Sequence, residues 1–292
     1  MSLWEHISQQ ITQATGESFK PNRQQSVGGG CINEVNKISD GKKSYFVKTN
    51  TIAHGDMFEA EAEALVEISN SNTVKVPEAV CYGDDGKSCF LVLEYMDLKG
   101  CCNMQQFGQQ FAAMHKVTHK QFGWHRNNTI GSTPQINSYH EDWVDFWREN
   151  RLGYQLDLAA RNGYGGELQS LGEKLMADFH VLFSTYTPNV SMLHGDLWGG
   201  NLSALSDGAA VIYDPAFYYG DRESDLAMTQ LFGGFDSNFY SSYNEAWPLD
   251  SGYSVRKEFY NIYHIINHLN IFGGGYHGQA INMIEQILSE IK

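Results

Sequence analysis

Cysteine is scarce in this sequence of 292 residues, and the cysteines are odd in number at five. They lack the CxxC spacing and the histidine partners of a zinc site, and they do not form an even set for a disulfide framework. The pattern therefore excludes a small disulfide-stabilised secreted domain and a zinc module. We expect a protein of the reducing cytoplasm.

Basic residues are also few, with 20 Lys and Arg against 34 Asp and Glu and a net charge of -14. A surface of this sign repels the phosphate backbone of nucleic acid and an anionic membrane. We therefore expect neither partner. A nucleotide can still bind where Mg²⁺, a lysine and backbone N–H groups cancel the negative field locally.

Long hydrophobic runs are absent, because no segment approaches the roughly 18 to 20 apolar residues that span a bilayer. Near the N-terminus, Leu3, Trp4, Ile7 and Ile11 recur at helical spacing among polar residues, which indicates an amphipathic helix rather than a signal peptide. Apolar and aromatic residues are plentiful, with 42% hydrophobic residues, 16 Phe and 16 Tyr. This composition predicts a folded, soluble protein with a packed core.

Residues 1–96 carry mostly strand signals. Glycines at 28–30, a turn at Asp40-Gly41 and the alternating segment SYFVKT predict three successive strands. A helix is expected over 56–69, followed by two strands, AVCYG and SCFLVLEYM, joined by a turn. The predicted order is β-β-β-α-β-β.

Residues 97–292 are dominated by helical periodicity. A single β-type island is expected at 190–215, with a hairpin turn at Asp207-Gly208. Helices are predicted over residues 103–117, 139–161, 166–185, 222–232, 237–246, 254–272 and 277–291. We therefore predict an α+β, bilobal protein-kinase-like fold. A small β-rich N-lobe with one central helix binds nucleotide (1–96), and a larger, mainly helical C-lobe carries catalysis and the substrate (97–292).

The strongest chemical signal is HGDLWGGN, followed after a hairpin by VIYD. Asp196 and Asn201 are five residues apart, and Asp214 lies one hairpin further on, as in the catalytic loop and metal-binding segment of protein kinases. This spacing predicts Asp196 as the catalytic base and Asn201 and Asp214 as Mg²⁺ ligands. For any one of them alone, an ordinary turn residue is an equal alternative, so the prediction depends on the combination.

Lys48 ends the third predicted strand, where a kinase lysine reaches the α- and β-phosphates of ATP. The next helix offers Glu61 on its apolar face with Phe58 and Leu65. A buried carboxylate requires a cation, so we predict a Lys48–Glu61 pair, with Glu59 as the alternative.

Three further parts of a nucleotide site are expected. Gly28, Gly29 and Gly30 are suited to close approach of backbone N–H groups to phosphates. Phe90, Val92 and Met96 are candidate walls for adenine, or else ordinary core residues, and backbone groups of Glu94 and Met96 would read the edge of the base.

On the acceptor side, Trp198 is a candidate platform for a sugar, with a structural role as a lobe anchor as the alternative. His264 and His268 are one helical turn apart, but no catalytic Glu lies between them, so hydrogen bonding in the core or in a substrate pocket is expected instead of a metal site, with His268 as the substrate candidate. His194 and Asp225 are expected to support the catalytic loop structurally.

Motifs along nearly the whole chain resemble those of the fructosamine kinases. The matching segments are GGGCIN, YFVK, MFEAEAEAL, LVLEYM, WVDFWRENRLGYQL, HGDLWGGN, YDPAFYYGDRESDLAM and NHLNIFGGGY. The resemblance implies an aminoglycoside-phosphotransferase-like fold, the cofactors ATP and Mg²⁺, and phosphorylation of the 3-hydroxyl of ketosamines such as ribulosamine, erythrulosamine and fructosamine. Such 3-phosphates decompose and release the amine, so the implied role is deglycation repair of a protein or metabolite.

The same resemblance implies a redox switch at Cys31 through an intersubunit disulfide, and with it a homodimer, although an inert loop cysteine is an equal alternative. Two other functions remain open. One is an aminoglycoside- or choline-type kinase, which shares the Lys, Glu, Asp, Asn and Asp set. The other is a pseudokinase that binds nucleotide without turnover, whose usual sign is a missing catalytic element.

Overall fold

The computed structural model describes residues 2–28 and 33–291. The chain divides into two compact units, Met1–Asn103 with Leu202–Pro215, and Met104–Asn201 with Ala216–Lys292. We expected a single boundary after residue 96. Here the first unit extends to Asn103 and also includes residues 202–215, which form a short hairpin about 100 residues further along the chain. Two backbone hydrogen bonds attach residues 100–103 to it, Gly100 N to Ala204 O at 3.0 Å and Asn103 N to Gly208 O at 3.0 Å.

The first unit is built on a five-stranded antiparallel sheet with the order β1-β2-β3-β5-β4. Its strands are β1 (Arg23–Ser26), β2 (Glu34–Ser39), β3 (Ser44–Thr51), β4 (Ala79–Asp84) and β5 (Ser88–Glu94). The additional hairpin consists of β9 (Leu202–Ala204) and β10 (Ala210–Ile212), with Gly208 in its turn at φ +87°. The predicted β-β-β-α-β-β order is confirmed.

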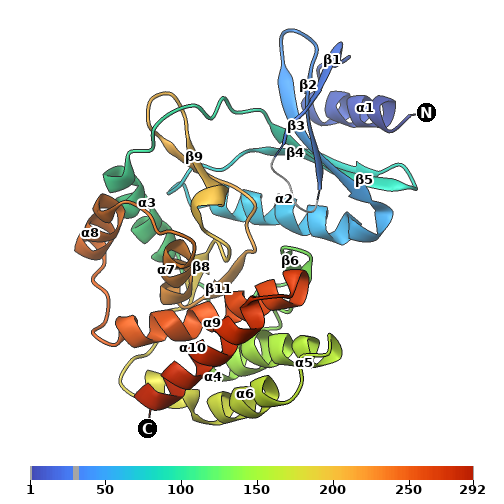
Figure 1. Cartoon of the computed structure of the whole chain (residues 1–292). Coiled ribbons are helices and arrows are strands. Elements are labelled where there is room, and N and C mark those ends of the chain that lie inside the picture. The colour runs from blue at the N-terminus through green and yellow to red at the C-terminus, as the bar shows by residue number, and fades with distance from the viewer. Residues whose placement is uncertain (1, 29–32, 292) are drawn as a thin grey trace. The chain divides into compact units, whose positions relative to one another are not determined.

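Two helices cover opposite faces of this sheet (Figure 1). Helix α1 (Leu3–Thr15) begins with a reciprocal capping box between Ser2 and Glu5, and its apolar side is buried. It packs against the side of the sheet that carries Val47 and Val92. Helix α2 (Gly55–Asn70) packs on β4 and β5, and its buried residues include Phe58 and Leu65.

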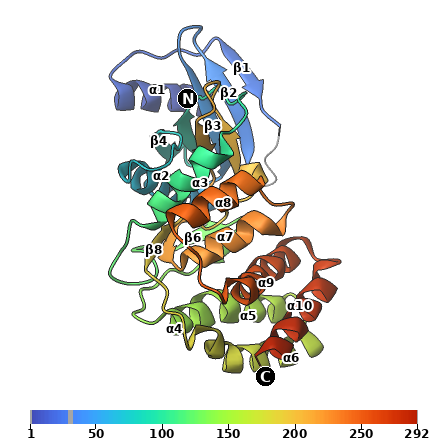
Figure 2. The ribbon, with the colours of Figure 1, turned by 90° about the vertical axis from the view of Figure 1, so that its left-hand side faces the viewer.

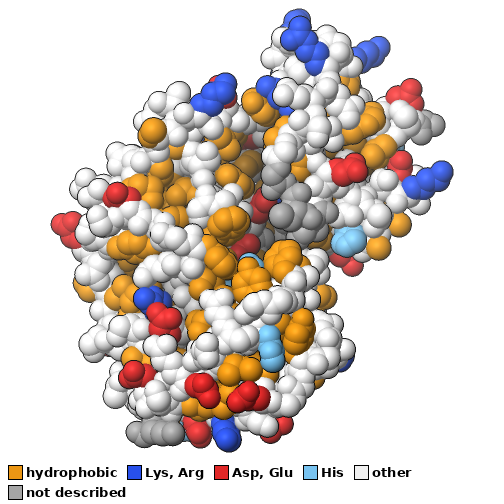
Figure 3. Space-filling view, viewed as in Figure 1, with side chains coloured by type: hydrophobic (Ala, Val, Ile, Leu, Met, Phe, Trp, Pro, Cys, Tyr) orange, Lys and Arg blue, Asp and Glu red, His pale blue; other side chains and the backbone are white. Residues whose placement is uncertain are grey.

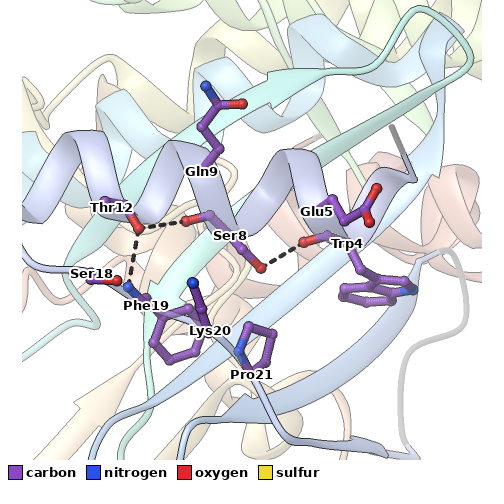
Figure 4. Close-up of a pocket in the computed structure, with 9 residues that line it drawn as sticks. All are labelled: Trp4, Glu5, Ser8, Gln9, Thr12, Ser18, Phe19, Lys20 and Pro21. Carbon is purple, nitrogen blue, oxygen red and sulfur yellow. Dashed lines mark hydrogen bonds between the residues drawn. The ribbon is translucent and has the colours of Figure 1, made fainter.

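A surface groove of about 560 Å³ runs between α1 and residues 18–21 (Figure 4). Trp4, Phe19 and Pro21 supply its apolar lining, and the hydroxyl of Thr12 accepts a hydrogen bond of 3.1 Å from the Phe19 amide. The groove lies on the α1 side of the sheet. Lys48 alternates with Val47 along β3 and therefore faces the other side.

The second unit is mainly helical, as expected, and α9 lies at its centre in contact with α5, α7 and α10 (Figure 2). Its helices are α3 (Met104–His115), α4 (Trp143–Trp147), α5 (Tyr154–Arg161), α6 (Glu167–Asp178), α7 (Arg222–Leu231), α8 (Ser237–Ala246), α9 (Tyr253–Phe272) and α10 (Tyr276–Glu290). All residues from Phe259 to Asn267 are buried, since helices and strands surround this part of α9.

Most predicted helices agree with the structure within a few residues, but residues 139–161 do not form one helix. They contain α4, a π-helical segment over Arg148–Gly153, and α5. The π segment points Asn150 and Arg151 into the interior. Three short strands were not predicted: β6 (Asn128–Ile130), β7 (Thr133–Gln135) and β11 (Tyr218–Gly220). Each is only three residues long, which is too short to show the alternation of apolar and polar residues by which a strand is recognised in a sequence.

Hydrophobic side chains reach the surface of the second unit on the face shown in Figure 3. The exposed large hydrophobic residues of this unit include Trp198 at 39% and Phe272 at 59%. Within residues 2–28 and 33–291, no helix combines the length and the apolar character needed to cross a bilayer.

Candidate active site

In the first unit, one buried lysine contacts two carboxylates. Lys48 Nζ lies 2.6 Å from Glu61 Oε1 and 2.5 Å from Asp214 Oδ1. The Lys48 side chain is 5% exposed and that of Glu61 is 10%, whereas that of Asp214 is 48%. The Lys48–Glu61 pair predicted from helical periodicity is present. Because the Asp214 side chain is half-exposed, its contact with Lys48 is the one of the two that a metal ion from solution can replace.

Local structure explains this contact. Lys48 pairs with Leu91 on β5, so its side chain leaves the sheet on the face covered by α2. On α2, Glu61 shares the buried side with Phe58 and Leu65. Burial alone would lower the pKa of Lys48, but the carboxylates of Asp214 and Glu61 outweigh burial and raise it. The amine therefore stays charged and suited to phosphate.

Asp214 follows β10 and has φ +57°, which is unusual for a residue other than glycine. Backbone in this region costs of order 1 kcal/mol and persists where the surrounding structure imposes it, often at functional sites. Here it coincides with the predicted metal ligand. The alternative of an ordinary turn aspartate does not explain why the side chain meets the buried lysine.

In the second unit, Asp196 and Asn201 are joined directly. Asn201 Nδ2 donates to the backbone oxygen of Asp196 at 2.8 Å and to its Oδ2 at 3.3 Å. Because the amide nitrogen is engaged in this way, the amide oxygen of Asn201 is the group left for a metal. The five-residue interval is closed by a 3-10 turn over Gly199–Asn201, with Asn201 N donating to Trp198 O at 2.9 Å.

The start of this loop is held by Asp225 of α7. Its two carboxylate oxygens accept the backbone N–H groups of His194 at 2.6 Å and Gly195 at 2.7 Å, and Oδ2 lies 3.3 Å from His115 Nε2. Burial would raise the pKa of Asp225, but the His115 hydrogen bond and charge outweigh burial and lower it. These contacts agree with the predicted structural role of Asp225, and the backbone amide of Asp196 donates to His194 Nδ1 at 3.3 Å, in keeping with a supporting role for that ring. His115 had no sequence signal, because its partner is 110 residues away.

Gly195 is the glycine that this loop requires. It has φ +83°, and a Cβ atom built on it would lie 1.9 Å from Ala216 O. Gly199 and Gly200, in the same loop, do not have positive φ. A Cβ at Gly200 would meet the Trp198 ring at 2.3 Å, whereas Gly199 has open space.

The donor set suits Mg²⁺, which prefers carboxylate and amide oxygens and keeps several positions for water and phosphate. Asp214 and Asn201 provide such oxygens. Within the described part of the chain, no group of three or more His, Cys, Asp or Glu residues is placed to hold a metal by itself. Each of these two oxygens is of the kind that would hold Mg²⁺ together with the phosphates of a nucleotide.

The expected adenine walls are wrong for two residues. Phe90 and Val92 are fully buried and pack against α1 with Ile7 and Ile11, so they face away from Lys48. The side of β5 that shares a face with Lys48 carries Leu91 and Leu93. Neighbouring residues on a strand point to opposite faces, and the cross-strand register that decides which face is used is not visible in the sequence.

On the Lys48 face, the partly exposed Phe46 and Val35 are better candidates for contact with a base. Phe46 is two residues before Lys48, and Val35 pairs with Lys48 across β2 and β3. After Glu94 the chain leaves the sheet, so backbone groups near Met96 are not part of the β5 ladder. Of the predicted phosphate loop, Gly28 is exposed, while Gly29, Gly30 and Cys31 lie outside the described residues.

An aromatic series extends from the catalytic loop within the second unit. The ring of Trp198 lies 6.1 Å from Phe232, and Phe232 lies 4.8 Å from His268, which also contacts Phe272 and Tyr276 at 5.6 and 5.2 Å. His268 Nδ1 lies 2.8 Å from the His264 carbonyl oxygen. Burial lowers the pKa of His268, which favours the neutral ring with Nε2 as an acceptor. The structure thus brings Trp198 and His268 into one cluster.

Known proteins provide an independent comparison. The family model described as fructosamine kinase matches residues 3–290. A "Probable ketoamine kinase" of Synechocystis sp. is 44% identical over 289 residues, covering 98% of this chain and 97% of that protein. The protein-ribulosamine 3-kinase of Arabidopsis thaliana is 40% identical, covering 91% of this chain and 83% of that protein.

Solved structures agree with this assignment. A Haemophilus somnus protein, provisionally assigned as a fructosamine-3-kinase, superimposes with a TM-score of 0.90 at 31% identity, covering 98% of this chain and 97% of that one. An aminoglycoside phosphotransferase bound to gentamicin has a TM-score of 0.62 at 13% identity over 99% of this chain and 94% of that one, which shows a shared fold. The protein therefore has the aminoglycoside-phosphotransferase-like kinase fold and belongs to the fructosamine kinase family.

Proposed function

We propose that this protein is an ATP-dependent kinase that phosphorylates the 3-hydroxyl of ketosamines and so acts in deglycation. The observation that carries the proposal is the family match over residues 3–290 in a chain that has the complete set of Lys48, Glu61, Asp196, Asn201 and Asp214. Relatives that match most of the chain include a protein-ribulosamine 3-kinase and a mouse ketosamine-3-kinase.

Each residue has a distinct role in this proposal. Lys48 binds the α- and β-phosphates, and Glu61 holds its amine in place. Asp214 and Asn201 provide the oxygens that would hold Mg²⁺, which neutralises charge on the β- and γ-phosphates when bound. None of these groups has to move a proton during transfer.

Asp196 orients the acceptor hydroxyl and accepts its proton. The oxygen at C3 forms a bond to the γ-phosphorus while the bond from that phosphorus to the ADP oxygen breaks, and ADP leaves. The hydrogen bond from Asn201 Nδ2 to Asp196 Oδ2, at 3.3 Å, fixes the carboxylate for this task.

On the acceptor side, we assign the sugar to the exposed face of Trp198 and a hydroxyl or ammonium donor of the substrate to His268 Nε2. The cluster of Trp198, Phe232 and His268 supports this assignment because aromatic faces attract both sugars and protonated amines. The net charge of -14 also favours a cationic substrate such as a protonated secondary amine.

The test is a panel of acceptors assayed for Mg-dependent ADP release. Ribulosamine, erythrulosamine and fructosamine are compared with kanamycin and choline, and NMR locates the phosphate on the product. We expect phosphate on O3 of a ketosamine. The Asp196→Asn variant should bind Mg-ATP normally but lose about 10²- to 10⁴-fold in turnover, as expected for loss of a general base. Activity on kanamycin or choline alone would contradict the proposal, and so would full turnover by the variant.

A further inference from the structure

The segment directly after Asp214 is held by side-chain amides from a distant hairpin. Ala216 and Phe217 are buried and precede β11. The carbonyl of Ala216 accepts a hydrogen bond of 2.9 Å from Gln135 Nε2, and the carbonyl of Phe217 accepts one of 2.8 Å from Asn128 Nδ2. Two consecutive backbone carbonyls are thus bound by two different side chains.

These two amides also hold each other. Asn128 and Gln135 are opposite one another in the β6–β7 pair, and Gln135 Nε2 donates its second hydrogen bond to Asn128 Oδ1 at 2.9 Å. Gln135 Oε1 accepts from the hydroxyl of Tyr263 at 2.9 Å. Gln135 is 1% exposed and Asn128 9%, so water does not compete for these bonds.

The buried guanidinium of Arg151 stabilises the β6–β7 hairpin through Asn137. Asn137 donates to Asn128 Oδ1 at 2.8 Å and accepts from Arg151 Nη2 at 2.8 Å. Arg151 comes from the π-helical segment, is fully buried, and places its guanidinium 4.0 Å from the centre of the Tyr218 ring. The hairpin that binds Ala216 and Phe217 is therefore itself fixed.

The Ala216 carbonyl also borders the catalytic loop. It lies so close to Gly195 that any Cβ there would be 1.9 Å from the oxygen. Ala216 is two residues after Asp214, and Gly195 is next to Asp196. One carbonyl, fixed by Gln135, thus adjoins both segments that carry the proposed chemistry.

We propose that Gln135 and Asn128 are positioning residues that hold the segment after Asp214 in one conformation, so that the metal-binding carboxylate needs no activating rearrangement. This inference rests on the proposed kinase function. In protein kinases the corresponding segment can change its packing and so switch activity. Here, any such rotation would remove the side-chain donors of two buried carbonyls and leave one N–H of each buried amide without its acceptor.

The experiment measures metal binding apart from phosphoryl transfer. Mn²⁺ is titrated by electron paramagnetic resonance in the presence of a non-hydrolysable ATP analogue, with wild type, Gln135→Met and Asn128→Asp. Both variants keep the approximate size of the side chain but remove the donor to the carbonyl. We expect Mn²⁺ affinity to fall by about 10- to 100-fold, the usual effect of losing groups that orient metal ligands.

Tyr263→Phe is the matched control. It removes a hydrogen bond from the same buried network but leaves both donors of Gln135 in place, so its Mn²⁺ affinity should remain close to wild type. A folded Gln135→Met protein with wild-type affinity would overturn the positioning role. An equal loss in Tyr263→Phe would overturn it too, since the network would then act only through general stability. Failure of wild type to bind Mn²⁺ with the nucleotide would instead contradict the proposed kinase function.

Hydrogen exchange on the wild-type protein covers the case in which the variants do not fold. We expect peptides spanning residues 214–219 to be equally protected with and without Mn²⁺ and the ATP analogue, because side chains already fix the segment. Rapid exchange in the free protein that slows on binding would show a segment that rearranges, and would overturn the inference.

Discussion

At the scale of single residues, burial distinguishes two glutamates that both remained candidate partners of Lys48 in the sequence. Glu59 and Glu61 both lie on α2, yet only Glu61 contacts Lys48, at 2.6 Å. Glu59 instead accepts a hydrogen bond from the Tyr82 hydroxyl at 3.3 Å, near the surface. Because Lys48 is almost completely buried, its carboxylate partner affects both stability and nucleotide binding, whereas a surface contact does little.

The two glutamates therefore offer a matched test. Glu61→Gln should lower the free energy of unfolding by about 1–3 kcal/mol, since it removes one charged partner of a buried amine. It should also raise the KM for ATP, because Lys48 loses its anchor. Glu59→Gln should change the free energy of unfolding by no more than about 0.5 kcal/mol. Urea unfolding and ATP titrations check both, and equal effects of the two substitutions would refute the assignment of Glu61.

At the scale of elements, the catalytic loop depends on contacts that are distant in sequence. Asp225 on α7 binds the amides of His194 and Gly195, and β8 (Ser191–Leu193) pairs with β11. Gly195 fits because it has φ +83° and no side chain towards Ala216. The loop conformation is thus imposed by α7 and the segment before β11, in addition to its own turn residues.

Two glycines of this loop should respond differently to the same substitution. Gly195→Ala forces a positive φ on alanine and a Cβ into Ala216 O, so we expect a loss of about 2 kcal/mol or more in the free energy of unfolding. Gly199→Ala meets no atom within 4 Å and has no positive φ, so its effect should be small. Urea unfolding midpoints of the two variants give the comparison. A Gly199→Ala variant as unstable as Gly195→Ala would show that the backbone of the whole loop, and not the Ala216 contact, sets the requirement.

At the scale of the whole molecule, the buried polar residues make stability depend on pH. His264 lies in the middle of α9 and is 4% exposed, and burial lowers its pKa to about 3. In the unfolded chain a histidine has a pKa of about 6.5. Below that pH, the unfolded chain binds a proton that the folded protein does not, so the stability contribution of His264 is lost as the pH falls from about 6.5 towards 3.

Replacing His264 should reduce this acid sensitivity. Between pH 6.5 and pH 5, the lowered pKa of His264 should decrease the free energy of unfolding of the wild type by about 2 kcal/mol. Glutamine does not titrate, so the decrease over the same interval should be smaller by about this amount in the His264→Gln variant. Urea unfolding at the two pH values measures the difference, in which other titrating groups cancel. Parallel pH profiles for wild type and variant would mean that the pKa of His264 is the same in the folded and the unfolded chain, so that burial does not lower it.

The sequence alone determined the α+β class and the β-β-β-α-β-β order of the first unit, and it indicated which residues to propose for chemical roles. These features depend on local patterns, namely alternation in the β-rich half, helical periodicity in the rest, and the fixed intervals joining Asp196, Asn201 and Asp214. The Glu61 prediction also succeeded locally, because one helical face decided it.

Only the tertiary structure decided those contacts in which a residue pairs with another that is far away in the sequence. Strand register turned Phe90 and Val92 towards α1 and left Phe46 and Val35 beside Lys48. The hairpin of residues 202–212 joined the first unit by backbone pairing that no local pattern encodes. Asn128 and Gln135 looked like ordinary polar residues until folding placed their amides against Ala216 and Phe217. A residue's chemistry can be read from its type, but its partner is set by which buried groups must satisfy one another in the folded protein.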